Sequence, residues 1–198
     1  MDLTPPHPLR FLEPIATVDD LVATLEKLRV NDVAATGVDR RDELGATAAF
    51  AAELVFKRDL GDLVRRTTPE VRLDGTYAAD FERFLDDWQD PETGYWGAWY
   101  EVDGKLLKAA DLSFTYHVVA YRDGRVNHWR QILATTLAIR DGEYPYGWRF
   151  RGEDNTHNAY DVVRILELGW PYLTPDERDR WRGVLKDLLR GVIAATLL

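Results

Sequence analysis

The stretch FLDDWQDPETGYW, residues 84–96, places a helix end directly before an aromatic turn. Apolar residues leading into it repeat at the spacing of one helix face: Tyr77, Phe81, Phe84, Leu85 and Trp88. Gln89 follows, and its amide group can donate and accept hydrogen bonds, so we expect it to tie the helix end to the next loop. Gly94 supplies the positive φ that the turn requires. The stretch therefore predicts a helical hairpin closed by Gln89, with the Trp96 indole stacked over it.

Helical periodicity continues beyond this hairpin. Segments 111–122 and 157–170 carry apolar residues on several faces, whereas 128–140 and 175–195 carry them on one face. In concentric rings of helical hairpins, an inner helix is covered on most sides and an outer helix on only one. The alternation therefore predicts an all-α fold, either an α/α toroid or a partial toroid, which is an arc of such hairpins.

The chain divides into three parts by pattern. An N-terminal helical hairpin is expected at 1–66, a polar linker at 67–76 and α/α-toroid repeats at 77–198, together forming one compact domain. The Asp-Gly-Lys sequence at 103–105 predicts a tight turn in a short β-hairpin between Trp99 and Leu107. Asp111 is expected to cap the helix that follows it.

Composition narrows the functional classes. The 198 residues carry a net charge of −9, which argues against a nucleic-acid partner, because affinity for phosphate backbones needs an excess of Lys and Arg. The chain has no cysteine, which excludes disulfides, thiolate catalysis and cysteine-bound metals. No apolar run is long enough to span a membrane, and the start lacks the pattern of a signal peptide, so we expect a cytoplasmic protein.

The C-terminal end predicts a further contact. The chain stops on apolar residues, without the polar or glycine-containing stop signal of a helix end. We therefore expect either a homodimer or an additional C-terminal region.

The residues from Phe84 to Trp96 resemble a known motif. Phe84-Leu85, three residues, Gln89, four residues, Gly94, one residue and Trp96 is similar to the glutamine–tryptophan repeat of the terpenoid cyclase and prenyltransferase superfamily, of squalene–hopene cyclase type. A second segment, ILATTLAIRDGEYPYGW at 132–148, repeats the pattern without the glutamine. The resemblance covers roughly 77–190. It implies an α/α toroid whose aromatic-lined cavity binds or converts a small hydrophobic or isoprenoid ligand.

The chemistry of that family carries over less well. Its cyclases protonate an alkene with an Asp-x-Asp-Asp motif, which is absent from this chain. Residues 86–90 spell the Asp-Asp-x-x-Asp pattern that prenyl-diphosphate enzymes use to hold Mg²⁺. We interpret these carboxylates instead as helix surface and as a turn former before Pro91. The sequence therefore requires no cofactor, and Mg²⁺ remains only an alternative.

The candidate catalytic residues lie in two neighbouring helices. His157 and Asp161 are four residues apart and share a helix face, with Glu153 close before them. Asp111 and His117 belong to the preceding helix with wide apolar coverage. General acid–base catalysis uses these residue types, so all five are candidates for it. The alternative is that they cap helices or form hydrogen bonds in the core. The spacing alone assigns no metal site.

The candidate ligand-binding residues are aromatic and amide side chains of the predicted loops and helix starts: Trp99, Tyr146, Trp148, Asn155 and Asn158. Aromatic walls stabilise carbocations in terpenoid enzymes and also stack on sugar rings. A small-molecule ligand is therefore expected. A carbohydrate-active toroid, of glycoside hydrolase or polysaccharide lyase type, would use Glu153, Asp161 and His157. The third interpretation is a non-catalytic helical scaffold for protein interaction.

Overall fold

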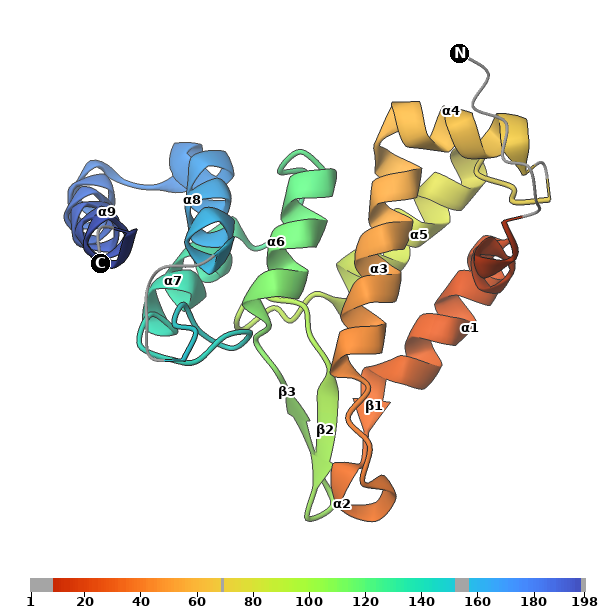
Figure 1. The fold of residues 1–198 in the computed structure, drawn as a ribbon, viewed down its shortest axis with the longest axis horizontal. Helices are drawn as coiled ribbons and strands as arrows, with labels where there is room; N and C mark the ends of the chain where they lie inside the picture. The colour runs from red at the N-terminus through yellow and green to blue at the C-terminus, as the bar shows by residue number, and fades with distance from the viewer. Residues whose placement is uncertain (1–8, 69, 152–156, 197–198) are drawn as a thin grey trace. The chain divides into compact units, whose positions relative to one another are not determined.

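The structure is a computed structural model and describes residues 9–68, 70–151 and 157–196 (Figure 1). Its α-helices are α1 (Val18–Arg29), α2 (Val33–Thr36), α3 (Arg41–Phe56), α4 (Arg58–Thr67), α5 (Gly75–Trp88), α6 (Leu112–Tyr121), α7 (Trp129–Ala138), α8 (His157–Gly169) and α9 (Pro175–Thr196). Short 3-10 helices are η1 (Arg10–Ile15) and η2 (Trp170–Tyr172). The strands are β1 (Val30–Asn31), β2 (Trp99–Val102) and β3 (Lys105–Lys108).

The chain is mostly helical, which confirms the predicted all-α class in its general form. The predicted hairpin at 99–107 is also present, as β2 and β3 joined by a turn in which Asp103 and Gly104 have φ values of 51° and 70°. Both central residues have positive φ because the right-handed twist of a hairpin favours such turns. The sheet is extended by β1, which the sequence did not predict.

The chain forms two compact units. The first contains Met1–Trp88 and Ala98–Leu107, and the second contains Gln89–Gly97 and Lys108–Leu198. This division differs from the predicted one, in which α5 belonged with the C-terminal repeats. In the structure, α5 packs against α1 and α3, so it is part of the first unit.

The core of the first unit is built on α1, α3 and α5. Leu21, Leu25 and Leu28 form the buried face of α1, as their spacing requires. The strand β1 continues from α1 and pairs in parallel with β2, joining Val30 to Trp99 and Asn31 to Tyr100. Trp99 therefore lies in this sheet.

In the second unit α6 and α8 lie side by side and run in the same direction (Figure 1). Gly124, just beyond the end of α6, lies against Leu168 in the last turn of α8. The helix α7 runs the opposite way, since the indole N–H of Trp129 at its start donates to the Gly124 carbonyl at 3.0 Å. The parallel arrangement brings the N-terminal ends of α6 and α8 together.

One expectation about these helices was wrong. The structure exposes one face of α8, where Tyr160 and Val163 are 59% and 44% exposed, although 157–170 was predicted to be covered on most sides. The physical reason is that apolar residue type does not by itself require burial, and single exposed apolar side chains are common.

The turn after α5 has the predicted Gln89 hydrogen bonds and the predicted positive φ at Gly94. The Gln89 Nε2 group donates to the carbonyl oxygens of Gly94 and Asn127, each at 2.8 Å. Gly94 has a φ of 72°, and a Cβ at this position would lie 2.6 Å from the backbone nitrogen of Ile132. Asp90 accepts the Glu92 N–H at 3.0 Å, as a turn former does. The turn therefore fixes the start of the second unit against α7.

In the described ranges, no helix is both long enough and apolar enough to cross a bilayer.

Candidate functional site

Asp111 lies at the N-terminal end of α6 in a fixed position. Its Oδ1 accepts the Phe114 N–H at 2.9 Å, which confirms the predicted helix cap. Its own N–H donates to the Trp96 carbonyl at 3.2 Å. The residue is 1% exposed, so its carboxyl group is held inside the second unit.

Asp161 projects from α8 into the same region. It is 3% exposed, and burial raises the pKa of its carboxyl group from 3.8 to about 7, with the charge of Asp111 as the second cause. The two carboxyl groups are therefore close enough to repel each other. Near neutral pH, the protonated and ionised forms of Asp161 are both populated.

Two hydroxyl groups from other elements lie near the carboxyl pair. The Tyr95 hydroxyl, from the turn after α5, and the Thr136 hydroxyl, from α7, are 2.8 Å apart. Thr136 donates to the Ile132 carbonyl at 2.6 Å, so it accepts from Tyr95. Burial raises the pKa of Tyr95 above its usual range, and the charges of both Asp residues add to the rise.

Asn158 lies one helical turn before Asp161 on the same side of α8. It is fully buried, and its Nδ2 donates to the Trp148 carbonyl at 3.4 Å. Its Oδ1 has no hydrogen-bond partner among the residues that the structure describes. A buried acceptor of this kind calls for an explanation, and a ligand hydroxyl would provide one.

Aromatic side chains lie beside Asp161 on α6 and α8. The rings of Tyr116 and Tyr160 meet edge to face at 5.7 Å. Burial, then a hydrogen bond and a charge interaction with Tyr160, then the charge of Asp161 raise the pKa of Tyr116 above its usual range. Tyr160 is 59% exposed, so this edge of the acidic cluster reaches the surface.

The predicted catalytic set is divided by the structure. Asp111 and Asp161 come together, whereas His117 stacks on the Tyr121 ring at 5.4 Å. His117 lies six positions after Asp111, which is about 9 Å along the axis of α6. Glu153 lies outside the described residues. His157 begins α8, but its side chain lies outside the described part of the chain.

The predicted ligand-binding residues are also dispersed. Trp99 belongs to the first unit, where Arg29 lies over its ring at 4.1 Å. Trp148 is buried and stacks on Trp181, with ring centroids 6.1 Å apart. Tyr146 is 40% exposed. Asn155 lies outside the described residues, and only Asn158 is placed beside the carboxyl pair.

Sequence reasoning did not assign a site role to Thr136 or Tyr160. Thr136 interrupts an otherwise apolar helix stripe, and a polar residue at such a position is a signal that it has a buried partner. Tyr160 gave no signal, since its place beside Tyr116 depends on how α6 and α8 pack. In the part of the chain that the structure describes, no group of three or more His, Asp or Glu residues is arranged to hold a metal ion.

Comparison of the chain with protein-family models, with curated proteins and with solved structures finds no match.

Proposed function

We propose that this chain is an enzyme that uses Asp161 as a general acid and Asp111 as its partner carboxylate on a hydroxylated, carbohydrate-like substrate. The observation that supports the proposal is the pair of buried carboxyl groups at the shared N-terminal end of α6 and α8. Glycoside hydrolysis commonly uses two carboxyl groups in this division of labour. Of the predicted catalytic residues, the proposal retains these two.

The protonation of Asp161 supports its role as the acid. A catalytic acid works best when its pKa lies near the working pH, because it then holds a proton and also releases it readily. Burial and the charge of Asp111 raise the pKa of Asp161 to about 7. Asp111 is fixed by the Phe114 N–H, so the charge that acts on Asp161 has a defined position.

The surrounding groups suit a sugar better than a hydrocarbon. The Oδ1 of Asn158, which has no partner among the described residues, can accept a hydrogen bond from a substrate hydroxyl group, and the exposed ring of Tyr160 offers a surface for stacking. An isoprenoid ligand would need aromatic rings facing a cavity. Beside Asp161 the exposed ring is that of Tyr160, whereas Tyr95, Trp96 and Trp148 pack in the core.

The toroid is part of the same proposal. The alternating directions of α6, α7 and α8, and the turn closed by Gln89, are the local arrangement that an arc of helical hairpins repeats. This supports the architecture that the sequence motif implies.

The test is a substrate panel combined with matched variants. Oligosaccharides and aryl glycosides should raise the melting temperature, and the aryl glycosides should release their aryl group, whereas prenyl diphosphates with Mg²⁺ should have no effect on the melting temperature.

Asp161→Asn should lower turnover by about 100-fold or more, the usual contribution of a catalytic acid. Asp187→Asn is the control, because Asp187 is exposed on α9 and pairs with Arg190 at 3.2 Å. Turnover should fall as the pH rises through 7, since the acid must be protonated.

Three results would overturn the proposal. Equal turnover by Asp161→Asn and Asp187→Asn would remove Asp161 from the reaction. A melting shift with prenyl diphosphates alone would favour the isoprenoid interpretation. No shift with either class would favour the non-catalytic scaffold.

A further inference from the structure

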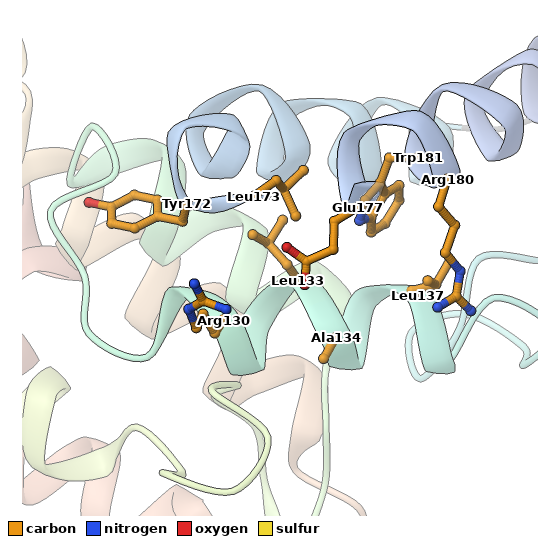
Figure 2. A pocket seen from close by; sticks show the side chains of 9 residues that line it. All are labelled: Arg130, Leu133, Ala134, Leu137, Tyr172, Leu173, Glu177, Arg180 and Trp181. Atoms are coloured by element: carbon orange, nitrogen blue, oxygen red, sulfur yellow. The ribbon is translucent and has the colours of Figure 1, made fainter. Parts of the chain in front are cut away.

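A hollow lies in the second unit, between α7 and the segment from η2 to the first turns of α9 (Figure 2). Its volume is about 120 Å³. The floor is apolar, since Leu133 and Trp181 are 3% and 2% exposed and Leu137 is half-buried beside them. This volume is slightly smaller than the cavity of about 150 Å³ that encloses benzene, but Arg130 and Arg180 are exposed, so a small ring or a short branched chain can enter part-way and stay partly in solvent.

Stacked aromatic rings hold the walls of this groove. Trp181 stacks on Trp148 with ring centroids 6.1 Å apart, and the Trp148 indole N–H donates to the Thr136 carbonyl at 2.7 Å. On the other side, Tyr172 stacks on Trp129 at 5.3 Å and 14°. The groove is therefore preformed, and a ligand would lose little binding free energy in ordering it.

The charged groups of the groove leave an excess positive charge. Figure 2 shows Arg130 from α7 and Arg180 from α9, with Glu177 between them. Glu177 accepts hydrogen bonds from the Thr174 N–H at 2.7 Å and from its hydroxyl at 2.8 Å. These bonds, followed by the charge of Arg130, lower the pKa of Glu177, so it is ionised at neutral pH. The three groups together carry one net positive charge.

Arg180 is the group left to bind an anion. In the described ranges, no hydrogen bond or ion pair engages its guanidinium group, whereas Arg130 faces the charge of Glu177. A guanidinium presents two parallel N–H groups, which match the two oxygens of a carboxylate. Beside it, Leu137 and Trp181 provide an apolar surface.

We infer that the groove between α7 and α9 binds a small carboxylate with an apolar body, with the carboxylate on Arg180 and the body over Leu133 and Trp181. A single negative charge balances the net charge of the groove. The volume limits the body to one aromatic ring or a short branched chain. This site is separate from Asp111 and Asp161 and does not depend on the catalytic proposal.

Titration of the full chain with small probes, followed by ¹H–¹⁵N NMR, tests the inference. Benzoate should shift the Leu133 amide and Trp181 indole signals with a Kd of about 1 mM, which is reasonable for a ligand of this size. Benzamide, which lacks the charge, and acetate, which lacks the body, should each bind about tenfold more weakly. Inorganic phosphate should cause no comparable shift at Leu133.

Matched variants test whether Arg180 binds the carboxylate of benzoate. Arg180→Gln should weaken benzoate binding about fivefold, a modest value because the side chain is exposed. Arg190→Gln should leave it unchanged, since Arg190 lies on the same helix and pairs with Asp187. Glu177→Gln should strengthen benzoate binding about twofold. The glutamine amide can still cap the helix, and the substitution removes a negative charge that repels the benzoate carboxylate. The inference is overturned if benzamide binds as tightly as benzoate, if Leu133 and Trp181 do not respond, or if Arg180→Gln and Arg190→Gln behave alike.

Discussion

The buried carboxyl group of Asp161 links proton binding to the stability of the second unit. Its pKa rises from 3.8 in its ordinary state to about 7, first by burial and second by the charge of Asp111. The folded chain therefore binds this proton more tightly than the unfolded chain does. The proton on Asp161 therefore stabilises the folded chain. This stabilisation is complete below pH 3.8, decreases as the pH rises and is lost once the pH passes about 7.

Asp161→Asn should remove this pH dependence. The variant carries no ionisable group at 161, so its free energy of unfolding should exceed that of the wild type by an amount that grows between pH 5 and pH 8. The difference in free energy of unfolding between variant and wild type should grow by at most about 1.4 kcal/mol for each pH unit. Urea unfolding at both pH values measures it, with Asp187→Asn as the exposed control. A difference between wild type and variant that is equal at both pH values would contradict the raised pKa.

Among the secondary-structure elements, the turn that joins α5 to the second unit depends most on one small residue. Gly94 has positive φ, and its Cα also lies against the backbone of α7. Gly104, in the β2–β3 turn, has almost the same φ, 70°, but no atom lies within 4 Å of a Cβ placed there. The two glycines therefore separate the cost of backbone conformation from the cost of a close approach.

Gly94→Ala should destabilise the chain by about 3 kcal/mol or more, because backbone atoms of α7 cannot move aside for the added methyl group. Gly104→Ala should cost only about 1–2 kcal/mol, the usual cost of a left-handed conformation for a residue with a side chain. Chemical unfolding of both variants measures the difference. Equal losses would show that the contact between the turn and α7 is looser than the structure indicates.

Sequence reasoning succeeded where neighbouring residues determine the structure. The Asp111 cap, the positive φ of Gly94 and the turn at 103–105 each depend on a few adjacent residues, and all three were predicted. By contrast, the contact of Tyr95 with Thr136 joins residues 41 positions apart. No periodicity indicates such a partner.

The same limit applied to the candidate site. The helix face shared by His157 and Asp161 was visible in the sequence, but it could not show that Asp111 approaches Asp161 while His117 turns towards Tyr121. The parallel packing of α6 and α8 decides both outcomes. The groove beside Arg180 depends on where η2 places α9, and the helix stripes give no information about that.

For the whole molecule, the main property is that neither unit is one continuous piece of chain. Residues 89–97 belong to the second unit and 98–107 to the first. The inserted segment 89–97 contributes Tyr95 and Trp96, which are 1% and 0% exposed, to the second core. The stability of the second unit therefore depends on residues that precede its helices by a β-hairpin.

A fragment of residues 108–198 should consequently fail to fold, because it lacks two large core side chains. A fragment of 89–198 should recover a cooperative thermal transition and dispersed NMR signals, since it restores both rings. Circular dichroism melts and NMR spectra of the two fragments measure this. A cooperative transition in 108–198 alone would show that residues 89–97 are dispensable.

The parallel pairing of β1 with β2 also has a consequence for synthesis on the ribosome. Val30 and Asn31 leave the ribosome long before Trp99 and Tyr100, which are their partners. The N-terminal helices therefore emerge while β1 still has an open edge, and an open strand edge invites pairing with other nascent chains. Because β1 has only two residues, it offers a very short template during that delay.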